Sequence, residues 1–150
     1  MPGKASLQAT RYYAHPRNAF WPIMGELLGF DPKADYTERT RALQKAGIGL
    51  WDVMRSCVRS SSLDSDIQET SIIPNDFPGW FQRHPHTRAI LCNGGKAFQS
   101  YQRHVLPLLE EPFRQLPLYQ LPSTSPAYAS FTLQQKQQEW HQVIKKAEED

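Results

Sequence analysis

Short apolar stretches alternate with helical patterns along this chain, and that alternation constrains its fold more than any other feature. Residues 48–53, 89–92 and 118–121 are apolar runs of strand length, and a polar or proline-containing turn follows each of them. Helices are predicted around and between these runs, over 19–28, 37–46, 76–83, 96–106 and 132–148. Strands that alternate with helices predict an α/β fold with a parallel sheet.

The composition excludes several classes of protein. A chain of 150 residues is long enough for one domain with one core, predicted over 1–150. No apolar run approaches the roughly 18 residues of a membrane span, and no signal peptide is recognisable, so a cytoplasmic protein that contacts no membrane is predicted. Cys57 and Cys92 are too few for an iron–sulfur cluster or a Cys-only zinc site. His84 and His86 have no third ligand at a recognisable spacing, so no metal and no cofactor are expected.

Residues 11–21 have the composition of a site. They combine four aromatic residues, two arginines, a histidine and an asparagine, a mixture too polar for a core and too aromatic for an ordinary loop. Asn18 is a good N-cap for a helix that begins at Ala19, which would hold it at a rigid position. The rings of Tyr12 and Tyr13 have the chemistry to stack on a base. The alternative stays open that Asn18 only caps the helix and that the tyrosines only pack.

The predicted sheet brings further polar residues to the same place. Because ligands bind beyond the carboxyl ends of parallel strands, Asp52, Asn93 and Ser123 should gather at one edge, beside residues 12–18. Asn93 is suited to read a base edge, but Asn-Gly-Gly is also a common turn, and Asp52 is equally suited to cap a helix. Lys4, Arg11 and Arg17 are the charged residues among the first 25, so the rim would be positive where phosphates lie.

Several blocks resemble a known family when they are taken in order. They are Met1-Pro2-Gly3 with Ser6-Leu7, then YYAHPRNAFW at 12–21, GIGLWDV at 47–53, AILCNGGKA at 89–97 and LPSTSPA at 121–127. Together they resemble the hypoxanthine (deoxyinosine) glycosylase branch of the uracil-DNA glycosylase superfamily. The resemblance implies a three-layer α/β/α fold with a short central parallel sheet. In the family a hydrophobic strand, central to the sheet, precedes Met-Pro-Gly. This chain begins at Met1, so that first strand is expected to be missing and sheet edges to be exposed.

The resemblance also implies an activity. A monofunctional DNA glycosylase of base excision repair would hydrolyse the N-glycosidic bond of a deaminated base flipped out of DNA, hypoxanthine first and uracil second. Asn18 becomes the catalytic residue, and its carboxamide would position water. Asp52 and His15 would lie beside the base, although a histidine that holds its own loop is the commoner use. The base-binding residues implied are Met1, Pro2, Gly3, Tyr13, His15, Asp52 and Asn93.

The remaining expectations concern the partner. The DNA-binding residues expected are Arg17, Lys96, Ser123, Thr124, Ser125, Ala127 and Tyr128. Hydroxyls of the 123–125 loop would meet phosphates, and Ala127 or Tyr128 would supply a wedge in the minor groove. A monomer is expected. Two other interpretations stay open: an inactive nucleic-acid-binding relative that lacks the first strand, and a small-ligand α/β module unrelated to DNA.

Overall fold

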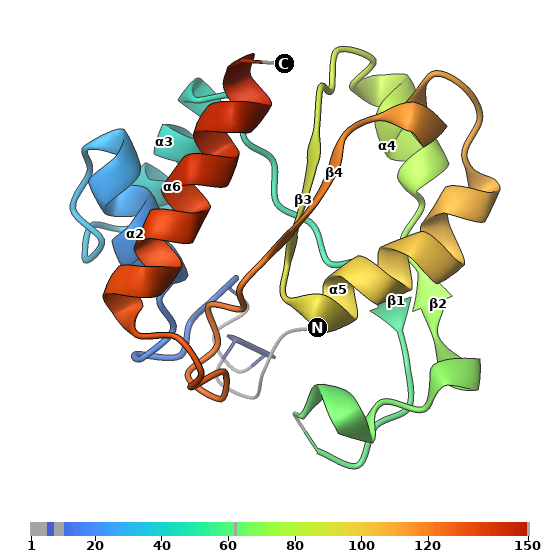
Figure 1. Cartoon of the computed structure of the whole chain (residues 1–150), viewed down its shortest axis with the longest axis horizontal. Coiled ribbons are helices and arrows are strands. Elements are labelled where there is room, and N and C mark those ends of the chain that lie inside the picture. Colours follow the sequence, from blue (N-terminus) through green and yellow to red (C-terminus); the bar gives the residue numbers. More distant parts are fainter. Residues whose placement is uncertain (1–5, 8–10, 62, 150) are drawn as a thin grey trace.

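A two-stranded parallel ladder with helices on both faces forms the centre of the molecule (Figure 1). The computed structural model describes residues 6–7, 11–61 and 63–149. Strand β3 (Ile90–Asn93) pairs with β4 (Leu118–Leu121), with Ile90 opposite Leu118 and Asn93 opposite Leu121. Both strands lie where apolar runs predicted them, and their parallel pairing is confirmed. Since side chains alternate along a strand, each residue of the ladder faces one of the two helical layers.

Helices α2 (Phe20–Leu28), α3 (Tyr36–Lys45) and α6 (Leu133–Glu149) cover one face of the ladder. Their apolar residues follow helical spacing, so one side of each helix is buried. The core of this face consists of Ala19, Phe20, Trp21, Ile23, Met24, Leu43, Leu121, Trp140 and Ile144. Helix α2 begins one residue after its predicted start, and the glycine at position 29, with φ of 80°, ends it in the left-handed conformation.

The other face is covered by α4 (Phe77–Arg83), α5 (Gly95–Ser100) and a π-helical turn, Tyr101–Val105, that continues α5. Two 3₁₀ turns, Leu106–Leu108 and Phe113–Gln115, lead back to β4. The second core consists of Phe77, Phe81, Cys92, Tyr101, Val105 and Leu109. The ladder therefore separates two cores, as a layered α/β arrangement requires.

The prediction of a strand at 48–53 is wrong, and the parallel sheet has two strands in the part of the chain described rather than the three expected. Residues 48–53 form no strand, because a strand requires a ladder of backbone hydrogen bonds to a neighbour, and among the described residues this run is not paired in one. Ile48 and Leu50 are instead half-buried against the core of α2, α3 and α6, which accounts for their apolar character. The strand that follows, β1 (Met54–Ser56), pairs antiparallel with β2 (Ile73–Pro74) in a separate small sheet.

The polar segment that begins near residue 57 and ends at β2 folds as a compact loop. It contains two 3₁₀ turns, η1 (Asp64–Asp66) and η2 (Glu69–Ser71). Ile67 and Ile72 of this loop form a small third core with Met54 of β1, and Cys57 packs against them.

Candidate functional site

The turn before α2 fixes Asn18 through short local contacts. The backbone N–H of Asn18 donates to the carbonyl of His15 at 2.9 Å, and Oδ1 of Asn18 accepts the N–H of Phe20 at 3.0 Å. The side-chain oxygen thus satisfies the free N–H of the first helical residue, although Ala19, and not Asn18 as predicted, occupies the N-cap position of α2. The N–H of Arg17 donates to Nδ1 of His15 at 3.1 Å, so His15 holds its own loop, the commoner of the two uses considered for it. The Asn18 amide is presented from a rigid helix end.

Thr124 joins three elements at this point. Its backbone N–H donates to Oδ1 of Asn93 at 3.0 Å, and Nδ2 of Asn93 donates to its hydroxyl Oγ1 at 2.9 Å. The N–H of Ala19 donates to the carbonyl of Thr124 at 2.9 Å. The end of β3, the loop after β4 and the start of α2 therefore meet at a residue that is only 1% exposed. Thr124 was expected to bind DNA, but its burial makes it the internal link of the site.

The glycine at position 94 allows the β3 end to approach this loop. Its φ is 97°, and a Cβ added there would lie 3.2 Å from the Cβ of Ser123. Both the backbone conformation and the close contact favour glycine. Asn93 is thus held at the strand end by a turn that packs directly on the 123–125 loop.

Tyr12 and Tyr13, together with Asp52, complete the set of side chains in the candidate site. Tyr13 has a positive φ of 57°, and its ring lies 4.1 Å, centroid to centroid, from that of Phe20. Burial raises the pKa of Tyr13 to about 12, opposed by a hydrogen bond with the Asn93 side chain, so the phenol stays neutral at physiological pH. Burial also raises the pKa of Tyr12, and the nearby Asp52 charge raises it further.

Asp52 is positioned by a residue that the sequence did not single out. Nδ2 of Asn75 donates to the Asp52 carbonyl at 2.7 Å, and the N–H of Asn75 donates to the carbonyl of Val53 at 2.9 Å. Burial raises the pKa of Asp52, although Arg59 opposes the shift. The Asp52 charge raises the pKa of both Tyr12 and Tyr13, so Asp52 lies near the two tyrosines. Asn93 and the 123–125 loop meet the start of α2 through Thr124.

The loop that follows β4 is attached to α6. Nζ of Lys136, a buried lysine, donates to the carbonyl of Ser125 at 3.1 Å and lies 5.4 Å above the ring of Tyr128. Oγ of Ser123 accepts the N–H of Ser125 at 3.1 Å, and Oγ of Ser125 accepts the N–H of Ala127 at 3.2 Å. Ala127 and Tyr128 are exposed at the tip, where a wedge was predicted.

A pocket of about 370 Å³ opens beside Asn18. Its lining consists of Pro16, Arg17, Asn18, Ala19, Pro22, Leu133 and Lys136. Leu133, on the first turn of α6, is 52% exposed and gives this pocket an apolar wall. Arg17 is exposed at its rim, so the predicted cation does lie next to the predicted catalytic residue.

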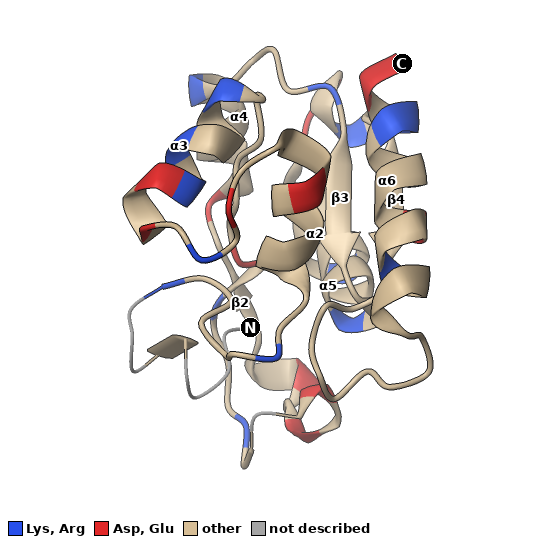
Figure 2. Ribbon diagram, turned by 90° about the vertical axis from the view of Figure 1, so that its left-hand side faces the viewer, with Lys and Arg blue, Asp and Glu red and all other residues tan. Residues whose placement is uncertain are grey.

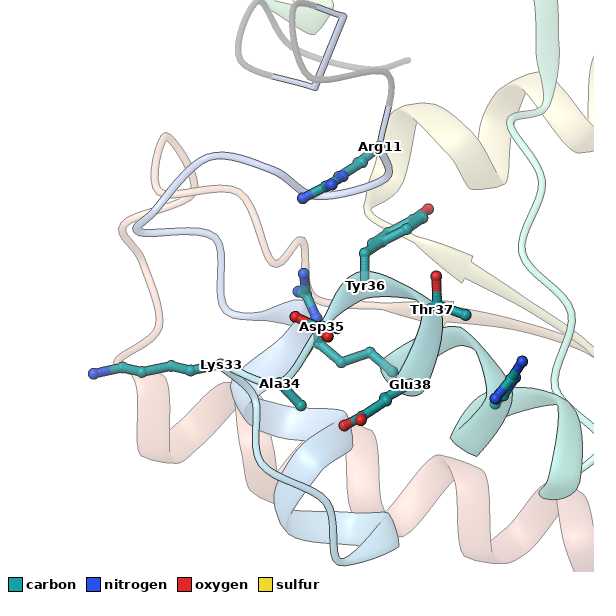
Figure 3. Close-up of a pocket in the computed structure, with 9 residues that line it drawn as sticks. Arg11, Lys33, Ala34, Asp35, Tyr36, Thr37 and Glu38 are labelled. Carbon is teal, nitrogen blue, oxygen red and sulfur yellow. The ribbon is translucent and has the colours of Figure 1, made fainter.

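A larger hollow of about 600 Å³ lies between Arg11 and the start of α3 (Figure 3). Arg11 lies over the ring of Tyr36, with its guanidinium carbon 5.4 Å from the ring centroid, and the hydroxyl of Tyr36 accepts the N–H of Tyr12 at 3.2 Å. Acids and cations alternate along its walls, from Arg11, Lys33, Arg39 and Arg41 to Asp35 and Glu38. These contacts hold the segment that carries Tyr12 and Tyr13 against α3.

Lys96, expected to meet phosphate, forms an ion pair instead: its Nζ lies 2.6 Å from Oε2 of Glu69. Met1, Pro2 and Gly3, expected to cover the base, lie outside the described residues.

Within the described ranges, no three His, Cys, Asp or Glu residues are placed to hold a metal ion. No helix in those ranges is long and apolar enough to cross a membrane.

Comparisons with known proteins identify the fold and the family of the chain. A solution NMR structure from Methanosarcina acetivorans, of a protein provisionally assigned as a uracil DNA glycosylase, superposes with a TM-score of 0.76 at 33% identity, over 98% of this chain and 86% of that one. The chain therefore has the fold of that class of protein. No family model matches.

Two curated relatives define the family. A hypoxanthine DNA glycosylase from M. acetivorans is 33% identical over 146 residues, which are 97% of this chain and 86% of that protein. Another from Methanosarcina barkeri is 35% identical over 98 residues, 65% of this chain and 61% of that protein. The chain belongs to the hypoxanthine DNA glycosylase family.

Proposed function

We propose that this protein is a DNA glycosylase that releases hypoxanthine, and uracil as a second substrate, from DNA in base excision repair. Its curated relatives are named for the first activity, and the superposed NMR structure is named for the second. The observation that carries the proposal is the set of hydrogen bonds by which Asn93 and Thr124 join the end of β3 to the start of α2, next to Asn18.

Hydrolysis of an N-glycosidic bond joins a water oxygen to C1′ of the sugar while the base leaves with the bonding electron pair. The carboxamide of Asn18 has too little proton affinity to act as a base, but its oxygen can accept from water and its NH₂ group can donate to the base or sugar. Asn18 is therefore proposed to position the water, which is an effect of orientation. The helix end that holds it supports this role, because the side chain loses no further freedom on binding.

The surrounding residues are proposed to bind the nucleotide. Tyr13, Asp52 and Asn93 would line the base site, together with His15 and the segment Met1, Pro2 and Gly3. Contacts to the DNA strands are proposed for Arg17, Lys96, Ser123, Ser125, Ala127 and Tyr128. The side chain of Asn93 already bonds to Thr124 and Tyr13, so it would present a fixed edge rather than a flexible one. A monomer working in the cytoplasm stays a prediction, which gel filtration and fractionation can check.

The experiment measures base release from a duplex with one deoxyinosine, read as alkali-cleavable abasic sites, and repeats it with deoxyuridine. Asn18→Ser keeps an oxygen that can cap α2 but removes the amide, so we expect native-like unfolding with a loss of base release of about 100-fold or more. Arg17→Ser, a neighbouring exposed change, is the control and should mainly weaken binding.

Full base release by Asn18→Ser would remove Asn18 from the mechanism. Wild-type protein that binds duplex in a salt-dependent way but releases no base would identify an inactive nucleic-acid-binding relative. Protein that binds no oligonucleotide at all would leave the small-ligand alternative.

A further inference from the structure

A cluster of cationic side chains surrounds one carboxylate outside the candidate site. Glu69, on η2, lies 2.6 Å from Nζ of Lys96, 2.9 Å from Nε2 of His104 and 3.4 Å from a guanidinium nitrogen of Arg103. Lys96 is on α5, and Arg103 and His104 are on the π-helical turn that continues it. All three donors thus come from one helical segment, whereas the carboxylate comes from the separate loop.

The donors suit a backbone phosphate as well as they suit the carboxylate of Glu69. Lysine, arginine and histidine side chains are the groups that proteins use to contact phosphate, and a backbone phosphodiester has one negative charge and two non-bridging oxygens, which is the charge and the number of acceptor oxygens that the carboxylate presents. Hydrogen bonds from Lys96, and then from His104, lower the pKa of Glu69 to about 2, so the carboxylate stays charged. Side-chain exposure is 18% for Lys96, 24% for His104 and 61% for Arg103, which leaves the cluster accessible from solvent.

The carboxylate comes from a loop outside the helical segment that carries the donors. The loop that carries η1 and η2 shares a small core with Met54 of β1 and projects below α5 (Figure 1). The acidic residues Asp64, Asp66 and Glu69 all lie on its two 3₁₀ turns, whereas cations and acids are mixed over the rest of the ribbon (Figure 2). An acidic loop over a cationic helix face opposes the approach of DNA unless the loop gives way.

The cluster also lies close to the candidate site. Lys96 is the second residue of α5, and the residue that precedes this helix, Gly94, packs on Ser123.

We propose that Lys96, Arg103 and His104 form a binding site for a DNA backbone phosphate, and that the carboxylate of Glu69 occupies this site until DNA displaces it. The proposal rests on the proposed function, because it takes DNA as the ligand. Glu69 thereby acts as an internal competitor, and releasing it frees the cations for the backbone. A purely structural ion pair, which would hold the loop and have no part in binding, is the alternative that the test must separate.

The test compares Glu69→Gln with Asp64→Asn by fluorescence anisotropy, using undamaged and deoxyinosine-containing duplexes over a series of KCl concentrations. Both variants remove one negative charge from the same loop, but Asp64 has no part in the cluster. We expect Glu69→Gln to bind both duplexes about 3- to 10-fold more tightly. The slope of log K against log salt should steepen by about the amount that one additional phosphate contact contributes. Asp64→Asn should change the affinity by less than about twofold.

A second variant keeps the test independent of the stability of the loop. Lys96→Gln should weaken DNA binding and flatten the slope of log K against log salt. Combined with Glu69→Gln, it should reduce the gain in affinity that Glu69→Gln gives alone. Lys45→Gln, which removes an exposed cation on α3, is the control for charge. Equal effects of Glu69→Gln and Asp64→Asn, or an unchanged slope in Lys96→Gln, would overturn the phosphate site.

Base release is measured on the same samples. Normal release without these differences in binding rejects the phosphate site alone. The expected differences without any release reject the proposed glycosylase activity alone.

Discussion

Replacing Thr124 by valine tests the link on which the geometry of the site depends. Valine has nearly the same shape as threonine but lacks Oγ1, which accepts from Nδ2 of Asn93 at 2.9 Å. The backbone bonds of residue 124, to Asn93 Oδ1 and from Ala19, do not involve the changed atom. Thr124 is 1% exposed, so its side of the contact excludes water, and the half-buried Nδ2 of Asn93 loses that acceptor.

An unsatisfied buried donor costs about 1–3 kcal/mol. The same volume is kept, so no cavity adds to this cost, and we expect Thr124→Val to destabilise the fold by about 2 kcal/mol. For a chain of this size that corresponds to a fall of about 4–8 °C in Tm. The freed Asn93 amide should also lower kcat for base release more than it raises KM, since orientation and not contact area is lost.

The assay is urea unfolding followed by circular dichroism, with the midpoint compared at constant m. Thr70→Val is the matched control: Thr70 is exposed on η2, and the change should stay within about 0.5 kcal/mol. Equal unfolding midpoints for Thr124→Val and Thr70→Val would refute the reasoning that a buried hydrogen bond joins β3 to the loop after β4.

Two further predictions use the same unfolding assay. Gly94→Ala should destabilise the protein by more than Gly47→Ala, because both residues have positive φ but only an alanine at 94 would also press on Ser123. The Gly47→Ala substitution should cost about 1–2 kcal/mol of unfolding free energy. Equal costs for the two substitutions would show that the contact with Ser123 is unimportant. The depressed pKa of Glu69, about 2 against an ordinary value of 4.5, stabilises the fold above about pH 4.5, and this contribution is lost as the pH falls toward 2. The difference in unfolding midpoint between wild type and Glu69→Gln should therefore shrink over that range, and a constant difference would show that the carboxylate is not held by its partners in the folded state.

The sequence predicted local features well. The bond from the Phe20 N–H to Asn18 Oδ1 joins residues only two positions apart, so the residue type and its position were sufficient to predict it, although the helix begins one residue later than expected. Strands β3 and β4 were predicted because their apolar runs end in turns that stop a strand. Residues 48–53 had the same appearance and form no strand, since strand formation depends on a neighbour that sequence pattern does not describe.

The parts of the site that join distant residues were harder to predict. The Glu69 and Lys96 side chains are 27 positions apart in the chain, and nothing in their spacing indicates an ion pair. Asn75 supports Asp52 through a turn that has no recognisable motif. Thr124 was assigned to the surface because it stands among serines and prolines, and only its packing against Asn93 and Ala19 reveals that it is internal.

The position of the ladder between two separate cores has a consequence for evolution. Asn18 depends on the packing of α2, α3 and α6, while the turn after Asn93 leads directly into α5 and its core on the opposite face. Selection for catalysis therefore acts on both cores at once. A substitution that one core tolerates can still misalign a site residue that the other core positions.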